Sequence, residues 1–240
     1  MATLFISDLH LRGAQPQLTQ LFEHFIDHLA SNAQAVYILG DLFEVWLGDD
    51  MVLPEYQPAL AAIHRLTARH IPVHVMYGNR DFLMREAFCA ITGATLLMEP
   101  ALIALHGTPT LLLHGDTLCT DDVRYQQFRQ MVRNPQFQTQ FLAKPPAERL
   151  AQVQQYRELS KAETSAKASD IMDVNQTTVE ATLRAHQVTQ LIHGHTHRPA
   201  VHQFNLDGQL MTRYVLADWG QRGSYLTCNG DGCELKFFTL

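Results

Sequence analysis

Residues 3–11, TLFISDLHL, place two polar side chains, Asp8 and His10, directly after an apolar run that is typical of a buried strand. Apolar residues then recur at helical spacing, at Leu18, Leu21, Phe22, Phe25, Ile26 and Leu29. The N-terminal sequence therefore predicts a strand that ends in a polar motif and is followed by an amphipathic helix.

The same alternation occurs twice more. QAVYILGD (34–41) precedes PALAAIHRLTARH (58–70), and IPVHVMYGNRD (71–81) precedes LMREAFCAIT (83–92), with Gly93 as a helix stop. This order predicts an α/β protein with a mainly parallel sheet covered by helices. Later stretches read as strand pairs around glycine-containing turns, at 101–116, 201–219 and 225–238.

A basic segment interrupts this pattern. Between Val123 and Ala168, eight basic residues stand against three acidic ones, a local charge of +5 that leaves −11 for the rest of the chain. Its apolar spacing predicts two helices joined through AKPPAE (143–148), forming a helical cap at about 123–168, inserted into a single domain that spans 1–240.

Bulk composition excludes several classes of protein. The 240 residues carry a net charge of −6, which argues against non-specific nucleic-acid binding. No apolar run is long enough to span a bilayer, and the N-terminal run is too short for a signal peptide, so we expect a cytoplasmic protein. Cys89, Cys119, Cys228 and Cys233 form no disulfide-dense pattern, which fits a reducing compartment; a bridge between Cys228 and Cys233 across the NGDG turn is the minor alternative.

Five polar motifs follow predicted strands. They are DLH (8–10), GDLFE (40–44), GNRD (78–81), HGD (114–116) and GHTH (194–197). Each motif alone is also explained as an ordinary turn or loop. Together, at the carboxyl ends of successive strands, where open α/β sheets bind ligands, they predict one shared site.

The ordered set resembles the calcineurin-like metallophosphoesterases, whose pattern is DxH, GDxxD/E, GNHD/E, an HG motif and GHxH. The resemblance implies a four-layer α/β/β/α sandwich and two divalent cations. One cation would be held by Asp8, His10, Asp41 and His197, and the other by Asp41, Asn79, His114 and His195, with Asp41 bridging. His193 matches no ligand position, and we expect it to be a strand residue.

The residue types fit such a centre. Imidazole and carboxylate ligands favour manganese, iron or zinc over magnesium or calcium. Two divalent cations outweigh Asp8 and Asp41 in charge, so the centre would attract a phosphate ester and stabilise its transition state. Arg80 stands where many superfamily members have His. Arginine is no general acid near neutral pH but can neutralise phosphate bidentately, which favours diphosphate cleavage.

A closer resemblance covers nearly the whole chain. ISDLHL, YILGDLFEVWLGDD, GNRDF, HGDTLCTDD, IMDVNQ and LIHGHTHRPAVH are similar to the UDP-2,3-diacylglucosamine diphosphatases of the lipid A pathway. This implies hydrolysis with two Mn²⁺ ions, in which water attacks the alpha phosphorus to release UMP and 2,3-diacylglucosamine 1-phosphate. It also implies a peripheral location on the cytoplasmic face of the inner membrane.

The resemblance assigns roles to individual residues. Catalytic residues would be Asp41, Asn79, Arg80, His114 and His195. Substrate contacts would come from Asn79, Arg80, Asp122, Ser160, Thr164, Lys167 and His195, with Tyr125 and Arg157 as further candidates. Thr164 stands where some members of the similar family have Asn, and Ala217 stands where members of that family have Gly.

The cap fits a lipid substrate. Phe128, Met131, Phe137, Phe141 and Leu142 could line a slot for acyl chains, and the basic side chains could meet an anionic membrane surface. The alternative is a pair of amphipathic helices packed on the sheet. Competing functions are a nuclease or nucleotide phosphodiesterase and a non-catalytic binding protein, of which the latter predicts missing ligands. We expect a monomer that binds no nucleic acid.

Overall fold

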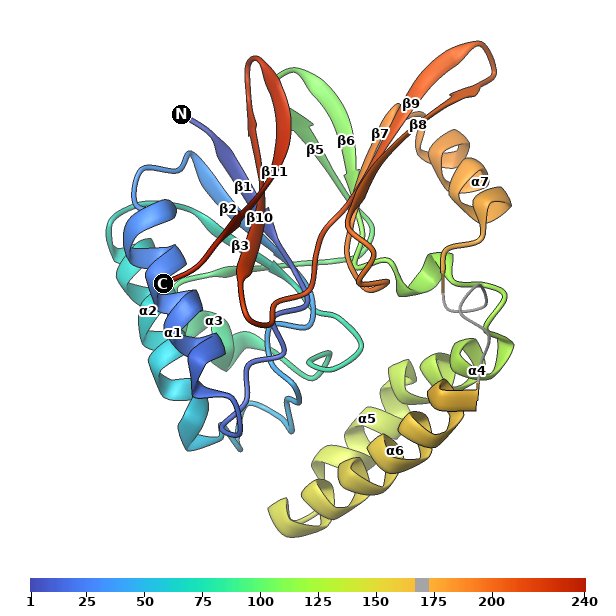
Figure 1. Ribbon diagram of the computed structural model, residues 1–240. Helices are drawn as coiled ribbons and strands as arrows, with labels where there is room; N and C mark the ends of the chain where they lie inside the picture. Colours follow the sequence, from blue (N-terminus) through green and yellow to red (C-terminus); the bar gives the residue numbers. More distant parts are fainter. Residues whose placement is uncertain (167–172) are drawn as a thin grey trace.

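Two β-sheets face each other in this computed structural model, with helices on their outer faces (Figure 1). The structure describes residues 1–166 and 173–240, of which 159–166 are described as backbone only. The first sheet has the strand order β11-β10-β1-β2-β3-β4, and the second has the order β5-β6-β7-β9-β8.

The first sheet is parallel over the three strand–helix units predicted from the sequence. β1 (Thr3–Ile6), β2 (Ala35–Leu39), β3 (Val73–Met76) and β4 (Thr95–Leu97) pair in parallel, and β10 (Gly223–Asn229) and β11 (Gly232–Phe238) add an antiparallel hairpin. In the second sheet, β6 (Thr108–Leu112), β7 (Gln190–His193) and β9 (Gln209–Val215) are parallel, and β5 (Ala101–Leu105) and β8 (Ala200–Leu206) pair antiparallel at the edges. Both sheets are therefore mixed.

Helices complete the four layers. The first sheet is covered by α1 (Pro16–His24), a π-helical turn η1 (Phe25–Leu29), α2 (Gln57–Ala68) and α3 (Glu86–Thr92), which ends at the left-handed Gly93. α7 (Gln176–His186) covers the second sheet. Two short 3₁₀ turns, η2 (Pro54–Tyr56) and η3 (Asp116–Leu118), lie in loops. The predicted α/β/β/α sandwich is confirmed.

Strand alternation builds a separate core between each pair of layers. In β1, Leu4 and Ile6 pack with the helices, whereas Phe5 points the other way, into the space between the sheets. There it belongs to a buried cluster with Leu39, Met76, Leu112 and Ile192. A third cluster joins the second sheet to α7 through residues such as Leu191 and Leu183.

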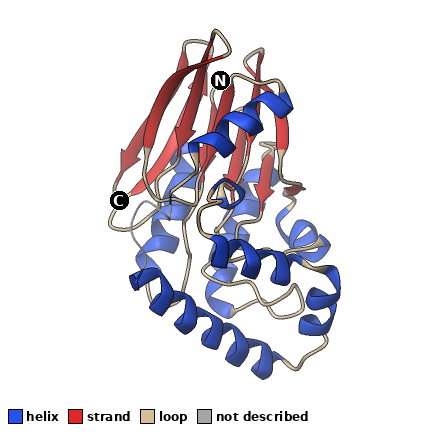
Figure 2. Cartoon of the chain, turned by 90° about the vertical axis from the view of Figure 1, so that its right-hand side faces the viewer, coloured by secondary structure: helices blue, strands red, loops and turns tan. Residues whose placement is uncertain are grey.

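The basic segment forms three helices where the sequence predicted two. They are α4 (Val123–Arg133), α5 (Pro135–Leu142) and α6 (Pro146–Ala166), and they lie beyond one end of the strands (Figure 2). The first predicted helix breaks at Asn134, whose side chain accepts hydrogen bonds from the backbone N–H groups of Gln136 and Phe137. Pro135 lacks the N–H that a continuous helix would need, so it begins a new one.

The cysteine prediction was wrong at one place. Cys228 and Cys233 form a disulfide with a Cα–Cα distance of 4.1 Å, directly opposite each other on β10 and β11. The hairpin register that places them opposite each other is the physical reason for the bridge. Cys89 and Cys119 remain thiols. None of the described helices is both long and apolar enough to cross a membrane.

Arg149 attaches the cap to the body of the protein. Both terminal nitrogens of its buried guanidinium donate to the Asp50 carboxylate, each at 2.7 Å. The guanidinium also donates to the backbone oxygens of Leu47, Leu142 and Lys144. Acceptors on both the cap and the body therefore depend on one side chain for their hydrogen bonds.

We expect Arg149→Met to lower the free energy of unfolding by about 2 kcal/mol, because the carbonyl oxygens would lose a charged donor. Denaturant titration measures this change. Arg184→Met is the control, since Arg184 forms a similar bidentate pair with Asp207 on the surface, where solvent weakens it. Equal losses in the two variants would contradict the anchoring role.

Candidate metal centre

All five sequence motifs lie at the predicted edge of the sheets. DLH, GDLFE and GNRD follow β1, β2 and β3 of the first sheet, and HGD and GHTH follow β6 and β7 of the second. The carboxyl ends of strands from both sheets thus meet at one place, and the sequence-based prediction of a shared location is confirmed.

The backbone at this edge is unusual. Asp8, His10, Asp41, His195 and His197 all have φ between 50° and 69°, the left-handed region that side chains other than glycine rarely adopt. Five of the seven predicted metal ligands therefore share a costly conformation, and such strain gathers at functional sites. The strained turns redirect each side chain from its strand end toward a common centre.

Two glycines allow the loops to approach closely. A Cβ atom on Gly194 would lie 2.0 Å from Oγ of Ser7 and 2.2 Å from Oδ2 of Asp8. A Cβ atom on Gly78 would lie 2.1 Å from Oδ1 of Asp41. Only hydrogen fits at these positions, so the glycines of GHTH and GNRD set the distance between neighbouring motifs.

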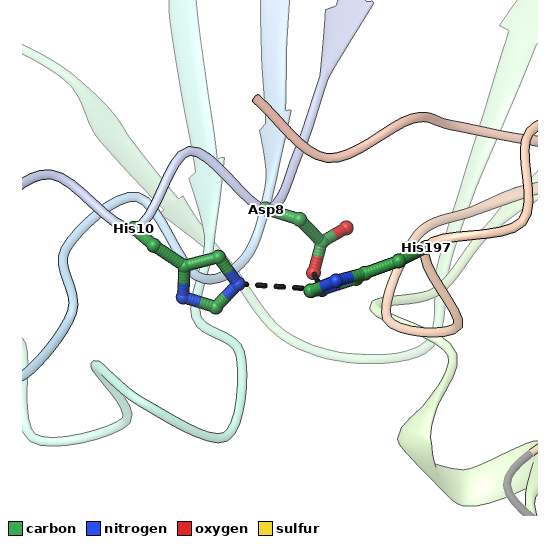
Figure 3. Close-up of side chains that lie close together, drawn as sticks. All are labelled: Asp8, His10 and His197. Carbon is green, nitrogen blue, oxygen red and sulfur yellow. Dashed lines mark hydrogen bonds and ion pairs between the residues drawn. The ribbon is translucent and has the colours of Figure 1, made fainter. Parts of the chain in front are cut away.

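Asp8, His10 and His197 form the first half of the site (Figure 3). Nε2 of His10 lies 3.3 Å from Nε2 of His197, and Nε2 of His197 lies 3.5 Å from Oδ1 of Asp8. One potential ligand atom from each residue falls within 4.8 Å of the others. The three side chains point toward one another and could hold a single cation.

The second half contains Asn79, His114 and His195. Oδ1 of Asn79 lies 3.0 Å from both Nε2 of His114 and Nδ1 of His195. Asp41 lies between the two halves, with Oδ2 3.9 Å from Nε2 of His10 and Oδ1 3.8 Å from Nε2 of His114. Asp8, Asp41 and His114 form a further group that could bind a metal ion. All seven predicted ligands are thus brought together.

The outer nitrogens of three histidines lie close to oxygen atoms, and that of His114 is hydrogen-bonded. Nδ1 of His10 lies 3.3 Å from Oε2 of Glu44, Nδ1 of His197 lies 3.6 Å from Oδ2 of Asp218, and Nδ1 of His114 donates to the backbone oxygen of Leu39 at 2.9 Å. A proton held at Nδ1 leaves the lone pair of Nε2 for a metal ion, as in other histidine-ligated centres. The donor set therefore fits divalent cations.

Electrostatics agree with a site built for positive charge. Burial acts to raise the pKa of Asp8, but the hydrogen bond with His197 and the nearby imidazoles lower it far more. Burial acts to lower the pKa of His114, yet Asp41, Asp8 and other carboxylates raise it to about 9. The carboxylates that favour a proton on His114 would also favour a metal cation in its place. Burial and the neighbouring His114 instead lower the pKa of His195 to about 4.

Two residues of the quoted motifs have roles that sequence reasoning missed. Asp81, fully buried, accepts backbone N–H groups of Asp41 and Leu42 from one loop and of Gly78 from the next. Glu44 lies against Nδ1 of His10 and also pairs with Arg12 and Arg157. The only sequence feature that could have revealed these roles is the position of Asp81 within GNRD and of Glu44 within GDLFE.

His193 is the last residue of β7 and is fully buried, as expected. Its Nδ1 lies 2.8 Å from the backbone oxygen of Gly194, and its Nε2 accepts from Arg213 at 3.1 Å. Burial, reinforced by Arg213, lowers the pKa of His193 to about 3, so the imidazole stays neutral. It contacts the first residue of the GHTH loop and is not one of the proposed metal ligands.

A cleft opens beside the second half of the site. Asn79, Arg80, Tyr125 and Arg157 line it, together with the cap side chains Phe128, Phe137 and Phe141. Nε of Arg80 is buried and has no hydrogen-bond partner among the described residues. Arg80 thus carries a buried donor without a partner at the junction of cleft and metal site.

The other predicted substrate residues differ in outcome. Asp122 is buried and caps α4 by accepting the backbone N–H of Tyr125. The side chains of Ser160 and Thr164 and the whole of Lys167 lie outside the described residues. Of the five predicted acyl-slot residues, Met131 is 42% exposed and Leu142 packs toward the core beneath the cap; neither is among the residues that line the cleft.

We expect Gly194→Ala to weaken the binding of divalent cations by about 10- to 100-fold, because its methyl group would displace Asp8. Calorimetric titration with Mn²⁺ measures this change. Gly230→Ala is the matched control, since no atom lies within 4 Å of its added Cβ. Wild-type affinity in the Gly194 variant would show that Asp8 is no ligand.

The chain is similar to known proteins over its whole length. Residues 1–199 match the family described as Calcineurin-like phosphoesterase. A UDP-2,3-diacylglucosamine hydrolase of Hahella chejuensis is 47% identical and covers 98% of this chain and 96% of its own. The relative of the same name from Xanthomonas oryzae pv. oryzae is 45% identical, with 100% of both chains covered.

The fold is also known from a solved structure. An archaeal phosphodiesterase superimposes with a TM-score of 0.51 at 13% identity, covering 100% of both chains. At that identity the likeness concerns the fold alone, whereas the curated relatives are close enough to show the family. The chain belongs to the UDP-2,3-diacylglucosamine hydrolases, within the calcineurin-like phosphoesterase family.

Proposed function

We propose that the protein hydrolyses the diphosphate bond of UDP-2,3-diacylglucosamine by water attack on the alpha phosphorus, releasing UMP and 2,3-diacylglucosamine 1-phosphate. The relatives' shared name supports the substrate. The single observation that carries the chemistry is the convergence of seven potential ligands from five strand ends beside a cleft that contains Arg80.

Two Mn²⁺ ions are the proposed cofactors. Asp8, His10, Asp41 and His197 would hold one, and Asp41, Asn79, His114 and His195 the other. Bound there, they would supply an activated water and positive charge for the phosphoryl group. Asp41 is proposed as the bridge because its two carboxylate oxygens face opposite halves of the site.

Arg80 and Asn79 would position the substrate phosphate. The backbone N–H of Arg80 is held by Oδ1 of Asp41 at 2.8 Å, which fixes the start of its side chain beside the centre. Its unpartnered Nε can donate to a phosphate oxygen and offset negative charge in the transition state. No proton donor is needed on this side, because the leaving group is itself a phosphate.

The cap, residues 123–168, is the proposed specificity element of a single domain. Three phenylalanines from α4 and α5 line the cleft with Val132, Val153 and Tyr156, which gives it the apolar walls that acyl chains require. Tyr125 is a further proposed substrate contact, which the 5.6 Å distance between its ring centroid and that of His195 supports. Asp122, Ser160, Thr164 and Lys167 remain proposed contacts.

We further propose that the protein is a monomer that works at the cytoplasmic face of the inner membrane. The basic cap supports this less than its charge suggests, because Arg129, Arg133, Arg149 and Arg157 all bond to the body of the protein. Exposed apolar side chains on α4, at Val123, Phe128 and Met131, are better placed to contact lipid.

The proposed reaction predicts strong substrate preference. With Mn²⁺, UDP-2,3-diacylglucosamine should be cleaved far faster than bis-p-nitrophenyl phosphate, and mass analysis should find UMP and the acylated sugar phosphate. If only the simple diester were cleaved, the metal-centre assignment would still hold, but the proposed substrate would be wrong and a nucleotide phosphodiesterase would be favoured.

Asp41→Ala should abolish turnover, since it removes the carboxylate between the two halves of the site. Steady-state assays with added Mn²⁺ measure this loss. Activity above a tenth of wild type would contradict the bridging assignment.

Arg80→Ala should slow hydrolysis by about 100-fold while metal content stays near wild type, because only transition-state charge stabilisation is lost. Metal analysis of the purified variant separates the two effects. Loss of manganese would instead show that Arg80 is structural.

A further inference from the structure

Helix α4 presents one face to the loops that carry metal ligands. Tyr125, Arg129 and Arg133 follow one another at four-residue spacing, so they lie on the same side of the helix. The hydroxyl of Tyr125 and Nε of Arg129 both donate to Oδ2 of Asp116 at 2.8 Å, in the loop just after His114. Nη2 of Arg133 donates to the backbone oxygen of Gly78 at 2.8 Å, immediately before Asn79.

Glu99 links the helix to His114 itself. Its Oε2 lies 3.3 Å from Nη2 of Arg129, and its Oε1 accepts the backbone N–H of His114 at 2.8 Å. Arg129 therefore reaches the main chain of a proposed ligand through a single carboxylate. None of the five motifs includes Glu99 or Arg129.

Burial makes this link energetically important. Asp116 is fully buried, the side chain of Glu99 is only 8% exposed, and Oδ1 of Asp116 has no hydrogen-bond partner among the described residues. Two neighbouring carboxylates in such surroundings need a cation between them. Arg129 touches both, so its removal would leave two buried like charges beside the His114 loop.

We propose that Glu99 and Arg129 are positioning residues that fix the backbone of His114, and that α4 is therefore part of the scaffold of the metal centre as well as a wall of the cleft. The proposal rests on the two-metal assignment above. It concerns only the half of the site that contains Asn79 and His114, because the described contacts of Tyr125, Arg129 and Glu99 do not reach His10 or His197.

The test is to measure the two steps of Mn²⁺ binding by calorimetry in the Arg129→Met and Glu99→Ala variants. We expect one of the two binding steps to weaken by about 10- to 100-fold, as for other residues that orient metal ligands, while the other step stays within about 2-fold of wild type. Arg129→Lys should recover part of the loss, because it keeps the charge but not the forked donors.

Arg149→Met is the matched control, since it removes a comparably anchored cap arginine that contacts the loop after β2 only at Leu47 and Asp50, beyond the GDLFE motif, and bonds to no proposed ligand. It should lower Tm without changing either binding step. Equal weakening of both steps in the Arg129 and Glu99 variants, or wild-type binding in both, would overturn the proposal. Fewer than two ions bound by the wild-type protein would overturn the two-metal assignment as well.

Discussion

One buried carboxylate holds together the loops that follow the strands of the first sheet. Asp81 accepts backbone N–H groups from the loops after both β2 and β3, and no water competes because it is fully enclosed. Burial and the neighbouring Asp41 raise its pKa to about 6, against the opposing effect of the N–H donors. In return, Oδ1 of Asp41 accepts the N–H of Arg80. Two carboxylates thus cross-link adjacent loops, and the positions of Asp41 and Asn79 follow from that link.

The distance between the two sheets is set by apolar packing just behind the ligands. Leu39, Met76, Leu112 and Ile192 lie in one buried cluster between the sheets, each one or two residues before a ligand-bearing motif. Because interiors are close-packed, a change of one methylene there would shift a strand end and the ligand beyond it. The metal centre is therefore an outcome of the same packing that joins the layers.

Local periodicity and the rule that parallel strands share an edge were sufficient to predict most of the strands and the gathering of the polar motifs. The four-layer arrangement was predicted from the family resemblance, and the short strand β4 was missed. The sequence did not predict the break of the first cap helix at Asn134, since apolar spacing continues across it. It also missed Glu99, whose contacts with Arg129 and His114 join residues distant in the chain. Charge counting placed the cap arginines on the surface, whereas four of them bond to the body. Such pairings follow from three-dimensional geometry and have no local signature.

The point at which the cap enters the chain has an evolutionary consequence. α4, α5 and α6 lie between β6 and β7, which are neighbouring parallel strands of one sheet. Parallel neighbours need a long crossover in any case, and the entropy of closing a loop grows only slowly with its length. Insertions and deletions in α5 and α6 can therefore remodel the proposed specificity element without a change in strand register, as long as α4 keeps its contacts with the ligand loops. In this architecture the proposed specificity element and the proposed metal centre are joined by the contacts that α4 makes with the loops after β3 and β6.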